Sequence, residues 1–277
     1  MFDLLMLQRL WLVPVGFVIG AYGTLIGAGG GFVLVPMLLM LYPQEAPEVI
    51  TSISLAVVFF NALSGSYAYA RLKRVDYRSG LLFAAASIPG AILGALSTSA
   101  VPRPLFDGLL GVLMVFASLF LVFHTHPRNG ERRMDCRNGL VRNLVEANGT
   151  AHAYSYSPKA GTGLSLLVGY VSSLLGIGGG IIHVPALVHL LNFPVHIATA
   201  TSQFVLTIMA LTGTTVHIAT GSFHHGIRRT IALAIGVLLG AQLGAFLSRR
   251  LGGLWIIRGL AVALGCVGIR ILILALT

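Results

Sequence analysis

The sequence predicts an all-α, polytopic membrane protein with about eight transmembrane segments in two tandem four-span repeats. Three observations support this fold class. Charged residues make up only 9% of the 277 residues, whereas about 25% is usual in a soluble domain. Hydrophobic residues make up 56%, the mean hydropathy is +0.89, and a glycine-rich motif occurs twice. The composition therefore excludes a water-soluble globule.

The apolar stretches are long enough to cross a membrane. A bilayer core requires about 20 mostly apolar helical residues. Between the fourth and fifth stretches lies the only long polar segment, which we interpret as a basic cytoplasmic linker. The expected division is a first four-span repeat over 1–123, the linker over 124–160 and a second four-span repeat over 161–277. The eight apolar stretches are 10–42, 49–70, 80–100, 105–123, 163–191, 197–221, 231–247 and 257–276.

The charge distribution predicts the orientation. Basic residues number 18 and acidic residues 8, which gives a net charge of +10. Lys and Arg accumulate in cytoplasmic loops, so the loop 71–78, with four basic residues, and the basic linker are expected in the cytoplasm. Eight crossings of the cell inner (plasma) membrane would then place both termini in the cytoplasm as well. No polar, basic face suggests nucleic-acid binding.

The linker contains a second pattern, which leaves two interpretations open. Apolar residues recur in it at helical spacing, which favours a short helix on the membrane surface, and the alternative is a flexible linker. The residues that carry this pattern are Cys136, Leu140, Val141, Leu144 and Val145.

An internal repeat supports a duplicated architecture. The segment 27–36, GAGGGFVLVP, returns 149 residues later as GIGGGIIHVP, with six of ten positions identical. Further along, Ser54 and Gly65 match Ser202 and Gly213 at a shift of 148 residues. Because each copy has an even number of spans, we expect both copies to have the same orientation in the membrane.

These residues resemble the sulfite exporter TauE/SafE family of membrane permeases. The resemblance rests on two copies of a G-x-G-G-G-x-x-x-x-P segment, each followed by a span rich in Thr and Ser, and it covers both halves but not the linker. It implies transport of a small sulfur-containing anion such as sulfite or a sulfonate.

The glycine motifs are expected to break the first helix of each repeat, or to make it re-entrant. Each glycine costs a helix about 0.8–1 kcal/mol relative to alanine. Free amide groups at such a break, followed by the N-terminus of a half-helix, suit an anion. The alternative is that the glycines only allow close helix packing. The glycines concerned are Gly27, Gly29, Gly30 and Gly31 in the first copy, and Gly176, Gly178, Gly179 and Gly180 in the second.

Polar side chains within the apolar spans are further candidates for substrate binding. Neutral donors can hold an anion reversibly, although Ser and Thr hydroxyls equally bond to carbonyls of their own helix. The histidine within the second glycine motif has two interpretations, a role in transport or a hydrogen bond that serves only helix packing. The candidates are Thr51, Ser52, Ser54, Asn61, His183, Thr201, Ser202 and Gln203.

The distribution of acidic residues limits the transport mechanism. No Asp or Glu follows Glu146, and no carboxylate lies deep in a span. Membrane carboxylates are the usual relays for protons or sodium, so facilitated export or coupling through histidine remains. The spacing of the histidines gives no metal site, and we expect no cofactor and no catalytic residue.

We therefore expect a permease that exports or exchanges a small anion, sulfite or an organosulfonate, by alternating access around two glycine-rich helix breaks. A passive anion channel is the alternative within the same class. An intramembrane hydrolase is a third interpretation. Such an enzyme is expected to have a nucleophile-elbow pattern such as G-x-S-x-G, and the serines of this sequence do not lie in that pattern. The expected partners are the anion and membrane lipids, and pairing into a homodimer is left open.

Overall fold

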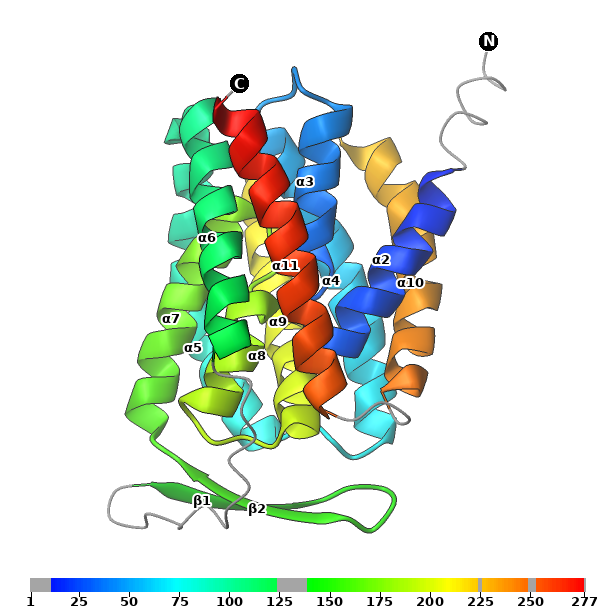
Figure 1. Cartoon of the computed structure of the whole chain (residues 1–277), viewed down its shortest axis with the longest axis vertical. Helices are drawn as coiled ribbons and strands as arrows, with labels where there is room; N and C mark the ends of the chain where they lie inside the picture. The colour runs from blue at the N-terminus through cyan, green and yellow to red at the C-terminus, as the bar shows by residue number, and fades with distance from the viewer. Residues whose placement is uncertain (1–10, 124–138, 224–225, 249–252, 277) are drawn as a thin grey trace.

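The computed structural model describes residues 11–123, 139–223, 226–248 and 253–276, which form a mostly helical bundle with a two-stranded hairpin at one end (Figure 1). We call this end the linker end. Outside the hairpin, the elements are α2 (Leu12–Ile26), α3 (Gly31–Leu41), α4 (Pro47–Arg71), α5 (Tyr77–Ser97), η1 (Thr98–Ala100), α6 (Arg103–Phe123), α7 (Pro158–Leu175), α8 (Gly180–His189), α9 (Val195–Ala219), α10 (Ile227–Leu247) and α11 (Gly253–Leu276).

The helix interruptions predicted at the two glycine motifs are present. Helix α2 stops at Gly27, with φ of 83°, and α3 begins after Gly30, with φ of 80°. Helix α7 stops in the same way at Gly176, and α8 begins after Gly179, whose φ is 69°. An L side chain rarely adopts such angles, so glycine is needed at these positions.

Each interrupted pair turns back on itself. At the end opposite the linker end, the Arg103 guanidinium at the start of α6 donates to the carbonyl of Leu39, near the end of α3. Helix α2 runs inward from this same end, and α3 returns to it (Figure 1). Helices α7 and α8 form the corresponding pair from the linker end, where Phe193, just beyond α8, packs on Tyr154 of the hairpin.

The central helices α4 and α9 pack antiparallel. A Cβ on Gly65, late in α4, would lie 3.3 Å from Cδ of Gln203, early in α9. A Cβ on Gly213, late in α9, would lie 2.8 Å from Cδ1 of Leu55, early in α4. The expectation of two copies in the same orientation is therefore wrong. The expectation assumed an even number of spans in each copy. In the structure the first segment of each copy turns back, and only the three helices that follow it run the length of the bundle. Three is an odd number, so the second copy is inverted relative to the first.

The outer helices approach one another through small residues. A Cβ on Gly236 of α10 would overlap the carbonyl oxygen of Val13 in α2, and one on Gly94 of α5 would overlap that of Tyr170 in α7. Such contacts bring backbones close together, as in membrane bundles. These glycines of α5 and α10 thus serve helix packing.

Five described helices are long and apolar enough to cross a membrane: Pro47–Arg71, Tyr77–Ala100, Arg103–Phe120, Val195–Ala219 and Ile227–Leu247. Apolar side chains cover their outer faces, as Phe116 with 66% and Leu239 with 61% exposure illustrate. The segments α2, α3 and α8 are apolar but shorter. These features make the chain a membrane-embedded helical protein.

The structure of the linker differs from two expectations, the all-α fold class and the short helix on the membrane surface. Residues 140–145 and 151–156 pair as antiparallel strands, β1 (Leu140–Val145) and β2 (Ala151–Tyr156). The turn between them contains Gly149 with φ of 87°, and Asn148 Oδ1 accepts from the Thr150 amide at 3.0 Å. Turn chemistry and strand-forming residues outweigh the helical spacing. Cys136 lies outside the described residues, and α7 already begins within the segment assigned to the linker.

The ends of the described chain also differ from the prediction. Helix α2 starts, and α11 ends, at the end of the bundle opposite the hairpin (Figure 1). These helix ends therefore lie away from the hairpin, whereas the expected cytoplasmic placement of the two termini stays a prediction, because residues 1–10 and 277 lie outside the described residues.

Candidate substrate site

The two glycine breaks lie against each other in the middle of the bundle. A Cβ on Gly31 would lie 2.6 Å from the carbonyl oxygen of Ile177. A Cβ on Gly180 would overlap the carbonyl oxygen of Gly27 and Cα of Ala28. The N-terminus of α3 therefore abuts the α7–α8 break, and that of α8 abuts the α2–α3 break. Both breaks are buried.

Serine side chains from the central helices hold the breaks reciprocally. Ser202 Oγ of α9 donates to the Gly27 carbonyl at 3.1 Å, and Ser54 Oγ of α4 donates to the Gly176 carbonyl at 2.6 Å. Each serine satisfies a carbonyl at the C-terminal end of an interrupted helix, which would otherwise lack a partner. In this conformation, both hydroxyls position the backbone and have no proton left to donate to a substrate.

A polar cluster of Thr24, Asn61 and Gln203 lies beside the first break. Thr24 Oγ1 donates to Asn61 Oδ1 at 3.1 Å, and Gln203 Nε2 donates to the Gly23 carbonyl at 3.2 Å. Asn61 Nδ2 and Gln203 Oε1 are buried and have no hydrogen-bond partner among the described residues. The Asn61 amide is thus a donor available to an anion.

The remaining side-chain candidates have separate surroundings. Ser52 Oγ donates to the Val49 carbonyl of its own helix at 2.7 Å, whereas Thr51 Oγ1 is buried without a partner in the described chain. Thr201 Oγ1 accepts from the Asp76 amide at 3.1 Å, towards the linker end. His183 Nε2 lies 3.4 Å from Ser165 Oγ. The predicted set is therefore spread along the bundle and is not one pocket.

Backbone amides at both breaks remain available. Among the described residues, the amides of Gly30 and Gly31, and those of Gly178 and Gly179, donate no hydrogen bond. Amides at the start of a helix, together with the positive end of its dipole, favour an anion. The two breaks thus bring two such helix starts close together.

At the linker end, the hairpin is tied to the bundle by charged and aromatic residues that the sequence prediction missed. Arg142 donates to Asp76 Oδ1 at 2.8 Å, and the Tyr154 hydroxyl donates to Asp76 Oδ2 at 2.8 Å. Burial raises the pKa of Asp76, but hydrogen bonds from Arg142, Ser79 and Tyr154 outweigh it and hold the pKa below its usual value. The sequence feature that could have indicated this site is Asp76, the single acidic residue in the basic loop 71–78.

A second carboxylate reinforces this closure. Glu146 of the hairpin turn accepts from Arg74 Nε at 2.7 Å and lies 2.9 Å from His152 Nε2. Burial raises the pKa of Glu146, but Arg74 and His152 together hold it below its usual value. Arg74 also reaches Ser248, just beyond α10, at 3.4 Å. The hairpin thereby joins elements from both halves of the chain.

A smaller set of contacts lies at the opposite end of the bundle. Arg229 at the start of α10 forms an ion pair with Glu45 at 2.9 Å, and its guanidinium carbon lies 3.7 Å from the centre of the Tyr42 ring. Both contacts join α10 to the loop between α3 and α4. Contacts of charged side chains therefore tie elements together at both ends of the bundle.

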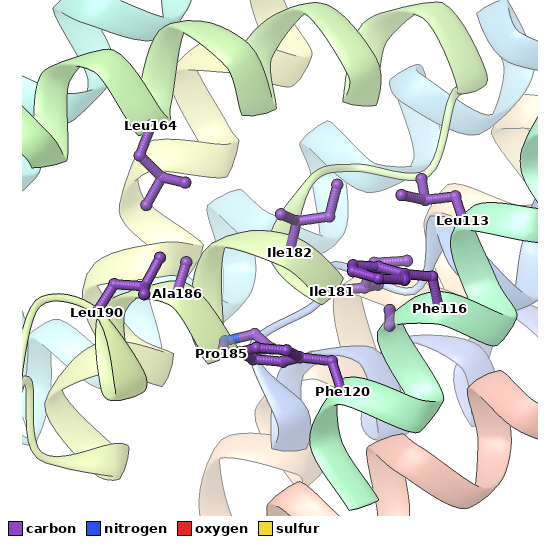
Figure 2. Close-up of a pocket in the computed structure, with 10 residues that line it drawn as sticks. Leu113, Phe116, Phe120, Leu164, Ile181, Ile182, Pro185, Ala186 and Leu190 are labelled. Atoms are coloured by element: carbon purple, nitrogen blue, oxygen red, sulfur yellow. The ribbon is translucent and has the colours of Figure 1, made fainter. Parts of the chain in front are cut away.

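A cavity of about 200 Å³ lies elsewhere, between α6, α7 and α8 (Figure 2). Its lining is apolar, so it offers an anion no donor and is not a candidate substrate site. The lining residues are Leu113, Phe116, Ala117, Phe120, Leu164, Ile181, Ile182, Pro185, Ala186 and Leu190.

Apolar helices that pack around two interrupted pairs define a membrane-embedded helical protein, and the family and relatives that the chain matches make it a membrane transporter and not an enzyme. The chain matches the family described as Sulfite exporter TauE/SafE over residues 12–271, and it belongs to this family. It is 34% identical over 264 residues to the Probable membrane transporter protein YunE of Bacillus subtilis, covering 92% of this chain and 95% of that protein. It is 22% identical over 284 residues to a probable membrane transporter protein of Methanocaldococcus jannaschii, covering 98% of both. No solved structure matches the chain.

Proposed function

We propose that the chain is a permease that exports or exchanges a small anion, with sulfite or an organosulfonate as its substrate, by alternating access around the two glycine breaks. The observation that carries the proposal is the central meeting of two helix N-termini with unbonded amides. Asn61 Nδ2 adds a buried side-chain donor beside the first break. A desolvated oxyanion needs several such donors to replace its water.

The membrane arrangement that we propose has six crossing helices and two re-entrant pairs. The crossing helices are the five long apolar helices and α11, with 24 residues. The pairs α2–α3 and α7–α8 enter from opposite sides and turn at the glycines. Two copies in opposite orientation form an inverted repeat, an arrangement whose transporters bind substrate near the membrane midplane where helices are interrupted.

The distribution of basic residues supports placing the linker end in the cytoplasm. Lys and Arg are enriched on the cytoplasmic side. The described part of the linker end carries Arg71, Lys73, Arg74, Arg78, Arg142 and Lys159 together with Asp76 and Glu146, and Arg249 and Arg250 follow Ser248 in the sequence. The opposite end carries Arg103, Arg228 and Arg229 together with Glu45, Glu48 and Asp107.

The charges favour transport without a carboxylate relay in the membrane. Asp107, one turn into α6, is paired with Arg103 at 3.1 Å. No carboxylate lies beside the central breaks in the described chain, so none repels an anion there. The membrane potential, negative inside, then favours anion export without a coupling ion.

Uptake of labelled sulfite, organosulfonate, sulfate and carboxylate into proteoliposomes tests the proposal. We expect saturable flux of sulfite or the organosulfonate, and counterflow when the lumen is preloaded with the unlabelled anion. Flux without saturation or counterflow would indicate the passive channel. Absence of anion flux under every imposed pH and voltage gradient would refute the proposal.

A further inference from the structure

Four buried polar side chains on α7 and α9 lack hydrogen-bond partners within the described residues. Ser172 and Ser173 are fully buried, His217 is 1% exposed and Thr214 is 8% exposed. The unpartnered atoms are the three hydroxyl oxygens and His217 Nε2. Native structures rarely leave several such groups together unless water or a ligand bonds to them.

The four side chains lead towards the central break. On α9, Thr214 follows Gly213 directly, and His217 lies one helical turn beyond Gly213, nearer the end opposite the linker. A Cβ on Gly213 would lie 3.2 Å from Ser173 Oγ. The adjacent Ser172 Oγ lies 3.0 Å from the position of a Cβ on Gly179, the residue that precedes α8. The hydroxyl of Ser172 is thus at the N-terminus of a ten-residue helix.

Two of the matching positions in the first copy are bonded. The sequence repeat aligns Ser173 with Thr24 and His217 with Tyr69. Thr24 Oγ1 donates to Asn61 Oδ1 at 3.1 Å, and the Tyr69 hydroxyl donates to the Thr24 carbonyl at 2.9 Å.

The second copy lacks the side chains that form these two hydrogen bonds in the first copy. The position of Asn61 is occupied by Met209, which cannot accept the hydroxyl proton as an amide oxygen does. His217 replaces the phenol of Tyr69. The difference in bonding between the two sides therefore follows from two substitutions between the copies.

We propose that Ser172, Ser173, Thr214 and His217 line a hydrated half-path from the end opposite the linker to the α8 N-terminus, where the Ser172 hydroxyl binds a small oxyanion. The proposal rests on the proposed function for the identity of the cargo, but the hydration of the path stands apart from it. Rotating hydroxyls and an uncharged imidazole can bond either to water or to anion oxygens. No carboxylate is among the four to repel an anion.

Cysteine labelling tests the half-path directly. Ser173→Cys and Thr214→Cys are placed singly in a chain whose native cysteines, Cys136 and Cys266, are replaced by serine. A membrane-impermeant, negatively charged methanethiosulfonate reagent is then applied from each side of the membrane. The matched controls are Thr24→Cys, at the bonded position of the first copy, and Leu211→Cys, on the outer face of α9 with 47% exposure.

We expect both test positions to react only from the side opposite the linker, more slowly in the presence of methanesulfonate, while both controls stay unlabelled. Labelling at the control rate from either side would overturn the half-path. Labelling in a protein that transports no anion would refute the proposed function while leaving the half-path standing.

A second measurement covers the case in which the cysteine variants fail to fold. Ser172→Ala should raise the half-saturating anion concentration about tenfold or more, because it removes a hydrogen bond to a charged group. The control is Ser87→Ala, whose hydroxyl donates only to the Ala84 carbonyl of its own helix at 2.8 Å. Equal concentrations for Ser172→Ala and the wild type would exclude anion binding by Ser172.

Discussion

Alanine at Gly180 tests the close contact between the two glycine breaks. Gly180 has no positive φ, so the cost of a side chain there is steric. Its Cβ would overlap the Gly27 carbonyl oxygen and Cα of Ala28, both of which belong to backbone that cannot rotate away. Overpacking of this kind costs about 1–3 kcal/mol. We therefore expect Gly180→Ala to lower the thermal unfolding temperature by the equivalent of about 1–3 kcal/mol, and to reduce anion flux because the two breaks are pushed apart.

The control for this variant is Gly163→Ala in α7, where a Cβ would meet no atom within 4 Å. Removing a helical glycine there should leave stability unchanged or raise it by up to about 1 kcal/mol. Both variants are measured as purified protein in detergent, by thermal unfolding, and in proteoliposomes, by initial uptake rate. An unfolding temperature and uptake rate equal to those of the wild type in Gly180→Ala would refute the contact between the breaks.

Three further predictions concern the hydrogen bonds and ion pairs around the breaks. Ser54→Ala and Ser202→Ala should each lower stability by about 1–3 kcal/mol, because a buried carbonyl loses its donor; unchanged unfolding temperatures would contradict this. The depressed pKa of Asp76 stabilises the fold above the ordinary value of 3.8, and this contribution is lost as the pH falls through the folded-state pKa. Unfolding of Asp76→Asn should therefore depend less on pH in the acidic range than that of the wild type, and equal dependence would argue against the Arg142 contact. Arg229→Ala should change stability by only about 0.2–1 kcal/mol, because its ion pair is partly exposed, and a larger loss in a denaturation curve would show that more than this pair closes the end.

The helix breaks could be predicted because their cause is local. Three glycines in each motif adopt positive φ, and few other residues tolerate this conformation. The direction of the chain after the break could not be predicted, because the same glycines permit a kink or a reversal. The reversal depends on distant contacts, such as that of Arg103 with the end of α3. Because each copy contains one such reversal, treating it as a straight crossing gave the wrong relative orientation of the two copies.

The hairpin illustrates a different limit. The sequence 140–145, LVRNLV, carries apolar residues at a spacing that suits a helix, yet it pairs with 151–156. Tyr154 and Tyr156, two residues apart, share the buried face of β2 and contact Phe193. Those aromatic contacts come from the loop between α8 and α9, beyond two further helices, so no local pattern could reveal them.

The substrate-binding residues expected from the sequence stay predictions, and the structure adds the surroundings of their side chains. Ser54 and Ser202 were expected to face a substrate, and they instead donate to the carbonyls of the opposite break. Asn61 keeps a free donor, as a binding residue requires. Ser172 and Ser173, which we propose as lining residues, could not be singled out from the sequence, because a serine in a glycine-rich span is ordinary. Only the lack of a hydrogen-bond partner among the described residues sets them apart.

The most direct test of the central claim is the initial rate of labelled sulfite uptake into proteoliposomes, measured with preloaded unlabelled sulfite and compared with empty liposomes. The account predicts saturable uptake that is accelerated by the preloaded anion. It also predicts that Gly180→Ala strongly reduces this uptake and that Gly163→Ala does not. Uptake no faster than in empty liposomes, for sulfite and for organosulfonates alike, would contradict it.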